Sequence, residues 1–277
     1  MSKKRKNYYE TNDKLKSLVK NRHYSNNFLR EFEYLLNCGA QPHKICGLFS
    51  ELIDLRDIQT IHLLMEYGYN PDSWNICYPF IKAVESNNTK IVELLYNYGA
   101  DINLKNFNGD TALHIAVKMG NDNMIMDLIN YKCDLYETNN RGETPLHISC
   151  INQDLDTIKT LLHFTNPNTS TIVYNRSRGK KVNVVQDVYI HGSVEIFRLL
   201  LPKSSLETLY PLTKYSYSTS SSSTLTQSIS PSHTKHRLVW SKIIEIVYFI
   251  DKIIKLHVKN DIGWLTKSVI GFLIPIQ

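Results

Sequence analysis

The stretch NGDTALHIAVKMGN, residues 108–121, returns one period later as NRGETPLHISCINQ, residues 140–153. Four residue types are each displaced by 33 positions, from Gly109, Thr111, Leu113 and His114 to Gly142, Thr144, Leu146 and His147. A fixed displacement of this length is the mark of an internal repeat. The sequence therefore predicts a repeat architecture, and it raises the question whether the recurring histidine does chemistry or holds a fold.

The period continues toward the N-terminus. Residues 78–103, YPFIKAVESNNTKIVELLYNYGADIN, align as the preceding copy, and residues 48–72 form a further copy with a shorter spacing of 31 between Gly68 and Gly99. Residues 28–42, FLREFEYLLNCGAQP, supply only the second half of a unit. We expect each copy to form two short helices, which must stack on their neighbours because one pair cannot bury its apolar face alone.

Local residue chemistry supports helix pairs. Glycine in the turn permits a tight backbone, and the threonine two positions later is a favourable helix start. Pro145 suits a first helical turn because its missing N–H is not needed there. Gln153 stands where Gly120 ends the corresponding helix, and Lys132 stands where the preceding copy has Gly99, so we expect left-handed non-glycine caps at some cost.

These residues resemble the ankyrin repeat. The segments GETPLHIS at residues 142–149 and LLYNYGADIN at residues 94–103 each match one half of its signature closely, and the resemblance covers about residues 28–201. The resemblance implies an all-α ankyrin-repeat solenoid of helix-turn-helix units with β-turn tips. It also implies that each histidine bonds to its threonine and to neighbouring backbone. The residues with this structural role are Gly109, Thr111, His114, Gly142, Thr144, Pro145 and His147.

Four segments are expected. They are a basic N-terminal segment at 1–27, four to five ankyrin repeats with degenerate ends at 28–202, a disordered Ser/Thr-rich linker at 203–236, and an apolar helical tail at 237–277. The tail includes residues 238–258, LVWSKIIEIVYFIDKIIKLHV, whose interspersed charges argue against a membrane span and favour packing on a partner or capping of the repeats. The alternative for the tail, whose residues 262–276 are shorter than a span, is a weak association with a membrane surface.

The last repeat is interrupted by residues 169–183, TSTIVYNRSRGKKVN, before VQDVYIHGSVEIFRLLL resumes a helix-turn-helix at 185–201. We interpret this segment as a solvated loop. Its basic side chains are also compatible with an acidic partner, but no aromatic interleaving supports nucleic-acid binding.

Charge and motifs limit the function. The first 22 residues hold six more basic than acidic residues, which equals the net charge of +6 of the whole chain. Five scattered cysteines show no metal-ligand spacing, so we expect reduced core thiols, no metal and no cofactor. Phosphate loops, GxSxG and HExxH are missing from the sequence, which favours a protein that is not an enzyme.

The Asn-, Tyr- and Ile-rich repeats are further similar to the ankyrin proteins of poxviruses. That resemblance implies immune-modulating or host-range capture of host proteins, in the host cytoplasm. The alternative location is the nucleus, through the basic residues Lys3, Lys4, Arg5 and Lys6. Many members end in an F-box-like motif that recruits a cullin-type ubiquitin ligase, but residues 200–212, LLPKSSLETLYPL, keep only the Leu-Pro of that motif. A ligase adaptor is therefore the alternative function.

Partner contacts are expected at the turn tips and the ends of the first helices, because side chains there point outward and the fold does not dictate their identity. The candidates are Asn106, Asn108, Asp110, Lys118, Met119, Asn140, Arg141, Glu143, Ile151 and Asn152.

Overall fold

A computed structural model describes residues 3–21, 27–42, 45, 47–70, 72, 78–167, 173–174, 181–191, 194–204, 209 and 242–245. They fall into two compact units, Met1–Asn139 and Asn140–Gln277. Each unit is described by itself below.

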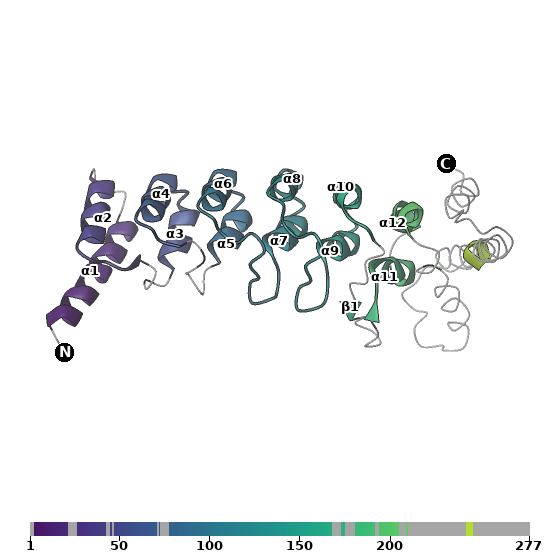
Figure 1. Cartoon of the computed structure of the whole chain (residues 1–277), viewed down its shortest axis with the longest axis horizontal. Helices are drawn as coiled ribbons and strands as arrows, with labels where there is room; N and C mark the ends of the chain where they lie inside the picture. Colours follow the sequence, from purple (N-terminus) through teal and green to yellow (C-terminus); the bar gives the residue numbers. More distant parts are fainter. Residues whose placement is uncertain are drawn as a thin grey trace, which may run out of the picture. The chain divides into compact units, whose positions relative to one another are not determined.

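The first unit consists of helices in consecutive pairs. They are α1 (Lys3–Lys20), α2 (Phe28–Asn37), α3 (Leu48–Asp54), α4 (Ile58–Glu66), α5 (Pro79–Glu85), α6 (Thr89–Asn97), α7 (Ala112–Met119) and α8 (Asp122–Asn130). Within each pair the two helices pack together, and α3, α5 and α7 also pack in succession (Figure 1). The second helices α2, α4, α6 and α8 form the upper row of this unit in Figure 1.

The core of the first unit follows from the repeat. Apolar side chains at equivalent positions of successive second helices are fully buried, as Leu64, Leu95 and Leu128 illustrate. Small residues on the first helices, Ala83 and Ala116, are also fully buried. Small side chains at these positions let neighbouring helices approach closely, which removes the apolar face of each pair from water.

The recurring histidine holds the start of the first helix. In α7 the backbone N–H of Thr111 donates to Nδ1 of His114 at 3.1 Å, and the Thr111 hydroxyl lies 2.8 Å from the same nitrogen. Because a backbone N–H can only donate, Nδ1 is the acceptor and the neutral ring carries its proton on Nε2. His114 is completely buried. The predicted Thr–His hydrogen bond is therefore present.

The second helices start with a different cap. At each start the side chain of an Asp or Asn accepts the backbone N–H three residues later, in every case at 3.2 Å; these N-caps are Asp57, Asn88, Asn121 and Asp154. A side-chain acceptor satisfies one of the N–H groups that a helix start leaves unbonded.

Two helices are followed by a non-glycine residue in the left-handed conformation, as the sequence predicts. Gln153 and Lys132 adopt φ angles of 59° and 63°, close to the 63° of Gly120. A β-carbon is strained in this left-handed region, so both residues carry a small cost that glycine would avoid.

Tyrosines join successive second helices on the solvent side. Tyr67, after α4, donates its hydroxyl to Glu33 at 3.3 Å and to Asn37 at 3.2 Å, both on α2. The hydroxyl of Tyr98, after α6, lies 3.3 Å from Nε2 of His62 on α4. Tyr131, after α8, stacks on Tyr96 of α6 with ring centroids 4.1 Å apart. We refer to Tyr67, Tyr98 and Tyr131 as the tyrosine rungs.

The second unit contains α9 (Pro145–Asn152), α10 (Leu155–Phe164), α11 (Val184–His191), α12 (Val194–Leu200) and the 3₁₀ turn η4 (Leu201–Lys203). Helices α9 and α10 pack as a pair, α11 packs on α9, and α12 packs on α10. The helix-turn-helix expected at 185–201 is therefore confirmed. Thr144 and His147 repeat the bond of α7, with Nδ1 of His147 at 3.2 Å from the Thr144 nitrogen.

The interruption of the last repeat differs from the expected loop. Strands β1 (Val173–Tyr174) and β2 (Lys181–Val182) pair antiparallel, with Val173 opposite Val182. Both strands contain β-branched valine and β1 adds a tyrosine, and these residue types favour extended backbone. The basic residues Arg176, Arg178 and Lys180 lie outside the described residues.

The ends of the chain are only partly described. The sequence predicts either an import signal or a disordered start at residues 3–6. In the structure these residues lie in the first turns of α1. Helix α1 packs on α2, and its residues Leu15 and Val19 are buried. Of the tail, residues 242–245 are helical and Ile244 is buried. The Ser/Thr-rich stretch 214–236 and the rest of the tail, including its capping role, lie outside the described residues.

The cysteines are not uniformly buried. Cys133 and Cys150 are buried, and burial raises the pKa of each thiol to about 12. Cys38 is exposed, so the expectation of a core thiol is wrong there. It follows the last turn of α2, beside the turn glycine Gly39, where the chain leaves the core.

Replacement of His114 by alanine removes the acceptor for the buried Thr111 N–H. We expect the free energy of unfolding to fall by about 1–3 kcal/mol, the cost of leaving such a donor without a partner. Chemical denaturation of both variants measures it, with the exposed His163→Ala as the control, which should change stability by no more than about 0.5 kcal/mol. Equal losses for the two variants would contradict the structural role.

Candidate protein-binding surface

The turn before α7 is built by one asparagine. Oδ1 of Asn106 accepts the backbone N–H groups of Asn108 at 2.9 Å and Asp110 at 3.0 Å, and its own backbone carbonyl accepts from Gly109 at 2.8 Å. Gly109 has a φ of 73°, which explains the need for glycine at this position. Asn106 therefore shapes the tip of the turn, and its amide oxygen is already engaged.

Phe107 is the most exposed large apolar side chain of the tip. It is 73% exposed, and its ring meets that of Tyr78, the N-cap of α5, edge to face with centroids 5.2 Å apart. A rigid aromatic side chain held outside the core is a frequent anchor in protein interfaces. Phe107 is not among the partner-binding residues predicted from the sequence. The available signal was an aromatic residue at a turn position that the repeat does not require to be apolar.

Adjacent tips within the first unit are tied together. Lys105 donates to the backbone oxygen of Thr138 at 2.8 Å and forms an ion pair with Glu137 at 2.5 Å. The hydrogen bond from Lys105 lowers the pKa of the Glu137 carboxyl. Oδ1 of Asn103 accepts the backbone N–H of Asp134 at 2.8 Å. These bonds fix one tip relative to the next.

Asp110 does not point outward as expected for a tip residue. Its side chain is 1% exposed, because its carboxylate receives Lys118 Nζ at 2.5 Å and Asn139 Nδ2 at 3.1 Å. Burial of a carboxylate requires such partners. The expectation that Asp110 is exposed is wrong, and its contacts hold the tip to α7 and to the next turn.

The exposed candidates of the first unit lie at the tip and at the end of α7. Asn108, Lys118 and Met119 are exposed, and Lys118 reaches back to the tip through Asp110. We refer to residues 105–110, 118–119 and 136–139 as the tip surface.

In the second unit, four of the five candidate partner-binding residues are exposed and one is buried. Asn140, Arg141, Ile151 and Asn152 are exposed, and Ile151 is 50% exposed at the end of α9. Glu143, which the repeat aligns with Asp110, is buried. The expectation of an outward-facing Glu143 is therefore wrong, as it is for the aligned Asp110.

The helix pairs match a known protein family. Residues 52–138 and, overlapping them, residues 80–171 match the family model for ankyrin repeats in three copies. The chain contains ankyrin repeats. The fold class predicted from the sequence is confirmed, and the Thr–His bonds of α7 and α9 lie inside the matched region. No curated protein matches the chain.

Ankyrin repeats stack into extended surfaces that bind other proteins. The ankyrin region of this chain is thus a protein-interaction module, and such modules are generally not enzymes. Within the described residues, no group of three or more His, Cys, Asp or Glu side chains is arranged to hold a metal ion. No helix among them combines the length and apolarity needed to cross a membrane.

The stabilisation provided by the Lys105–Glu137 ion pair between neighbouring tips should depend on pH. Because the folded-state pKa of Glu137 is lowered, its ion pair stabilises the protein above the unfolded-state pKa of about 4.3, and this stabilisation is lost as the pH falls through the folded-state pKa. Lys105→Met should return the Glu137 pKa toward its ordinary value. NMR titration of the carboxyl carbon measures the shift, and the exposed Lys90→Met should leave it unchanged. A Glu137 pKa that stays low in Lys105→Met would contradict the assigned cause.

Proposed function

We propose that this chain is a non-enzymatic binding protein that captures a host protein on the tip surface of its ankyrin repeats, with Phe107 as the principal anchor. The observation that carries the proposal is the exposure of Phe107 on a turn whose neighbours are hydrogen-bonded in place. An anchor on an ordered turn loses little conformational entropy when it binds, which favours affinity.

The charge of the tip surface supports an apolar contact at its centre. Lys105 is paired with Glu137 and Lys118 is paired with Asp110, so the main charges near Phe107 are compensated within the surface. Met119 adds an exposed, adaptable apolar side chain on the same surface. A partner that offers an apolar pocket with a polar rim would fit this arrangement.

We further propose that the partner is a host signalling or defence protein and that the chain is viral. The support is the similarity of its Asn-, Tyr- and Ile-rich repeats to poxvirus ankyrin proteins, together with degenerate repeats beside well-formed ones. The ligase-adaptor alternative has no recognisable recruiting motif in the sequence.

The test is affinity purification of the full-length protein from host cells, read by mass spectrometry. Phe107→Ala should lose at least about 2 kcal/mol of binding, or roughly 30-fold in affinity, for the direct partner. The matched control is Tyr34→Ala, an aromatic residue on α2 that is also largely exposed and lies outside the tip surface. If both variants retain the partners equally, the tip surface is not the binding site. Recovery of cullin-ligase subunits would favour the alternative function as a ligase adaptor.

The host cytoplasm is the location we propose. Residues 1–22 fused to a fluorescent reporter should leave the distribution of the reporter unchanged. Nuclear accumulation that disappears when Lys3, Lys4, Arg5 and Lys6 are replaced by alanine would contradict this location and identify an import signal instead.

A further inference from the structure

A groove separates α2 from α4 on the row of second helices, away from the tip surface. Its volume is about 250 Å³, and it is lined by residues of these two helices alone. A space of this size accommodates one or two side chains of a partner rather than a whole cofactor.

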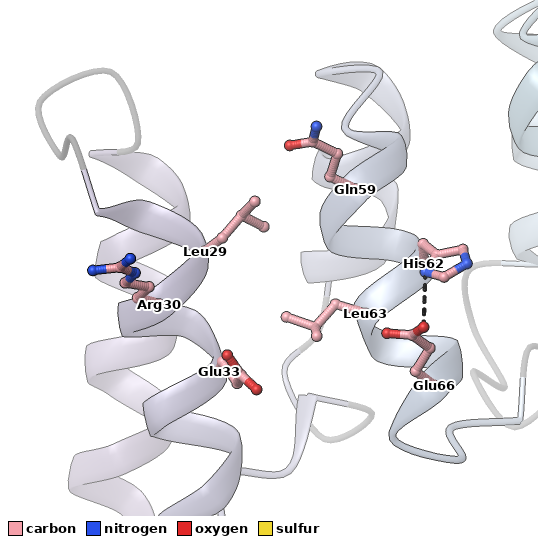
Figure 2. A pocket seen from close by; sticks show the side chains of 7 residues that line it. All are labelled: Leu29, Arg30, Glu33, Gln59, His62, Leu63 and Glu66. Carbon is pink, nitrogen blue, oxygen red and sulfur yellow. Dashed lines mark ion pairs between the residues drawn. The ribbon is translucent and has the colours of Figure 1, made fainter.

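The middle of the groove is apolar. Figure 2 shows Leu29 on α2 and Leu63 on α4 pointing toward each other across the gap. Leu29 is 37% exposed, and Leu63 is half-buried. Two leucines facing each other across a gap leave apolar surface in water that an inserted aliphatic side chain would cover.

One end of the groove is acidic. Glu33 lies four residues after Leu29 on α2, and Glu66 lies three residues after Leu63 on α4, so both carboxylates are one helical turn beyond the leucines. Tyr67 donates its hydroxyl to Glu33 at 3.3 Å, and His62 Nδ1 lies 3.5 Å from Glu66.

The charge at this end is not balanced by a permanent cation. Among the described residues, neither Glu33 nor Glu66 is paired with a lysine or an arginine. Arg30 of α2 also lines the groove, but its side chain points away from α4 in Figure 2. On α4, Gln59 lies one turn to the other side of Leu63 and contributes a neutral amide. The groove thus runs from a neutral end through an apolar middle to an acidic end.

We propose that this groove binds a helix of a partner protein that carries a bulky aliphatic residue with a lysine or arginine one turn away. A helix fits between two helices by placing its side-chain ridge in their groove. The aliphatic residue lies between Leu29 and Leu63, and the cation lies between Glu33 and Glu66.

The observations favour a basic helix because complementary charge fixes both the partner and its direction. A reversed helix would place its cation beside Gln59, where no carboxylate lines the groove. This site is separate from the tip surface, so a protein could occupy it while a host partner is bound to Phe107.

The experiment uses two fluorescein-labelled, alanine-based helical peptides and the full-length protein. Both peptides carry one leucine, and they differ only in having two lysines or two glutamates at the third and fourth positions after it. Fluorescence anisotropy should show the lysine peptide binding at least about tenfold more tightly than the glutamate peptide, a difference of about 1.4 kcal/mol. The double variant E33K/E66K should reverse this preference, and Leu29→Ala should weaken binding of the lysine peptide.

Matched variants separate the groove from general electrostatics. E85K/E93K changes the net charge equally with residues that do not line the groove, and it should keep the preference for the lysine peptide. Phe107→Ala should bind the lysine peptide as the unaltered protein does. Circular dichroism confirms that each variant is folded. No binding of either peptide, or a preference that survives in E33K/E66K, would overturn the proposal.

Discussion

Two short helices cannot enclose a hydrophobic core by themselves, and this constraint governs the first unit. Each pair leaves its apolar face open until a neighbour covers it, so leucines such as Leu64, Leu95 and Leu128 recur at matching positions and are fully buried. Close stacking brings polar backbone into the same interior. The Thr–His bond at the start of α7 satisfies a buried N–H there, which is why the histidine recurs with the threonine.

Much of the helix arrangement was predictable from the sequence, because successive copies of a repeat show the same residue types at the same positions. The 33-residue displacement gave the helix pairs, and the positions of Gln153 and Lys132 gave the left-handed caps. The paired strands β1 and β2 were not anticipated, since they occur once and have no second copy to reveal a pattern.

The candidate surface was harder to predict, because exposure depends on contacts that are distant in sequence. Asp110 was expected to face solvent, but Asn139 lies 29 residues further on and helps to bury it. Phe107 was missed because the repeat signature says nothing about turn residues that vary. A repeat fixes the residues that hold the fold, and it leaves the residues that select a partner free to differ.

The tyrosine rungs and the tied tips act on different edges of the first unit. Lys105 and Glu137 join neighbouring repeats at the turns, and Tyr131 stacked on Tyr96 joins neighbouring repeats along the second helices. A stack fastened along one edge alone would open like a hinge about that edge. Contacts along both edges oppose opening about either edge, so a bound partner meets turns whose positions are already set by their neighbours.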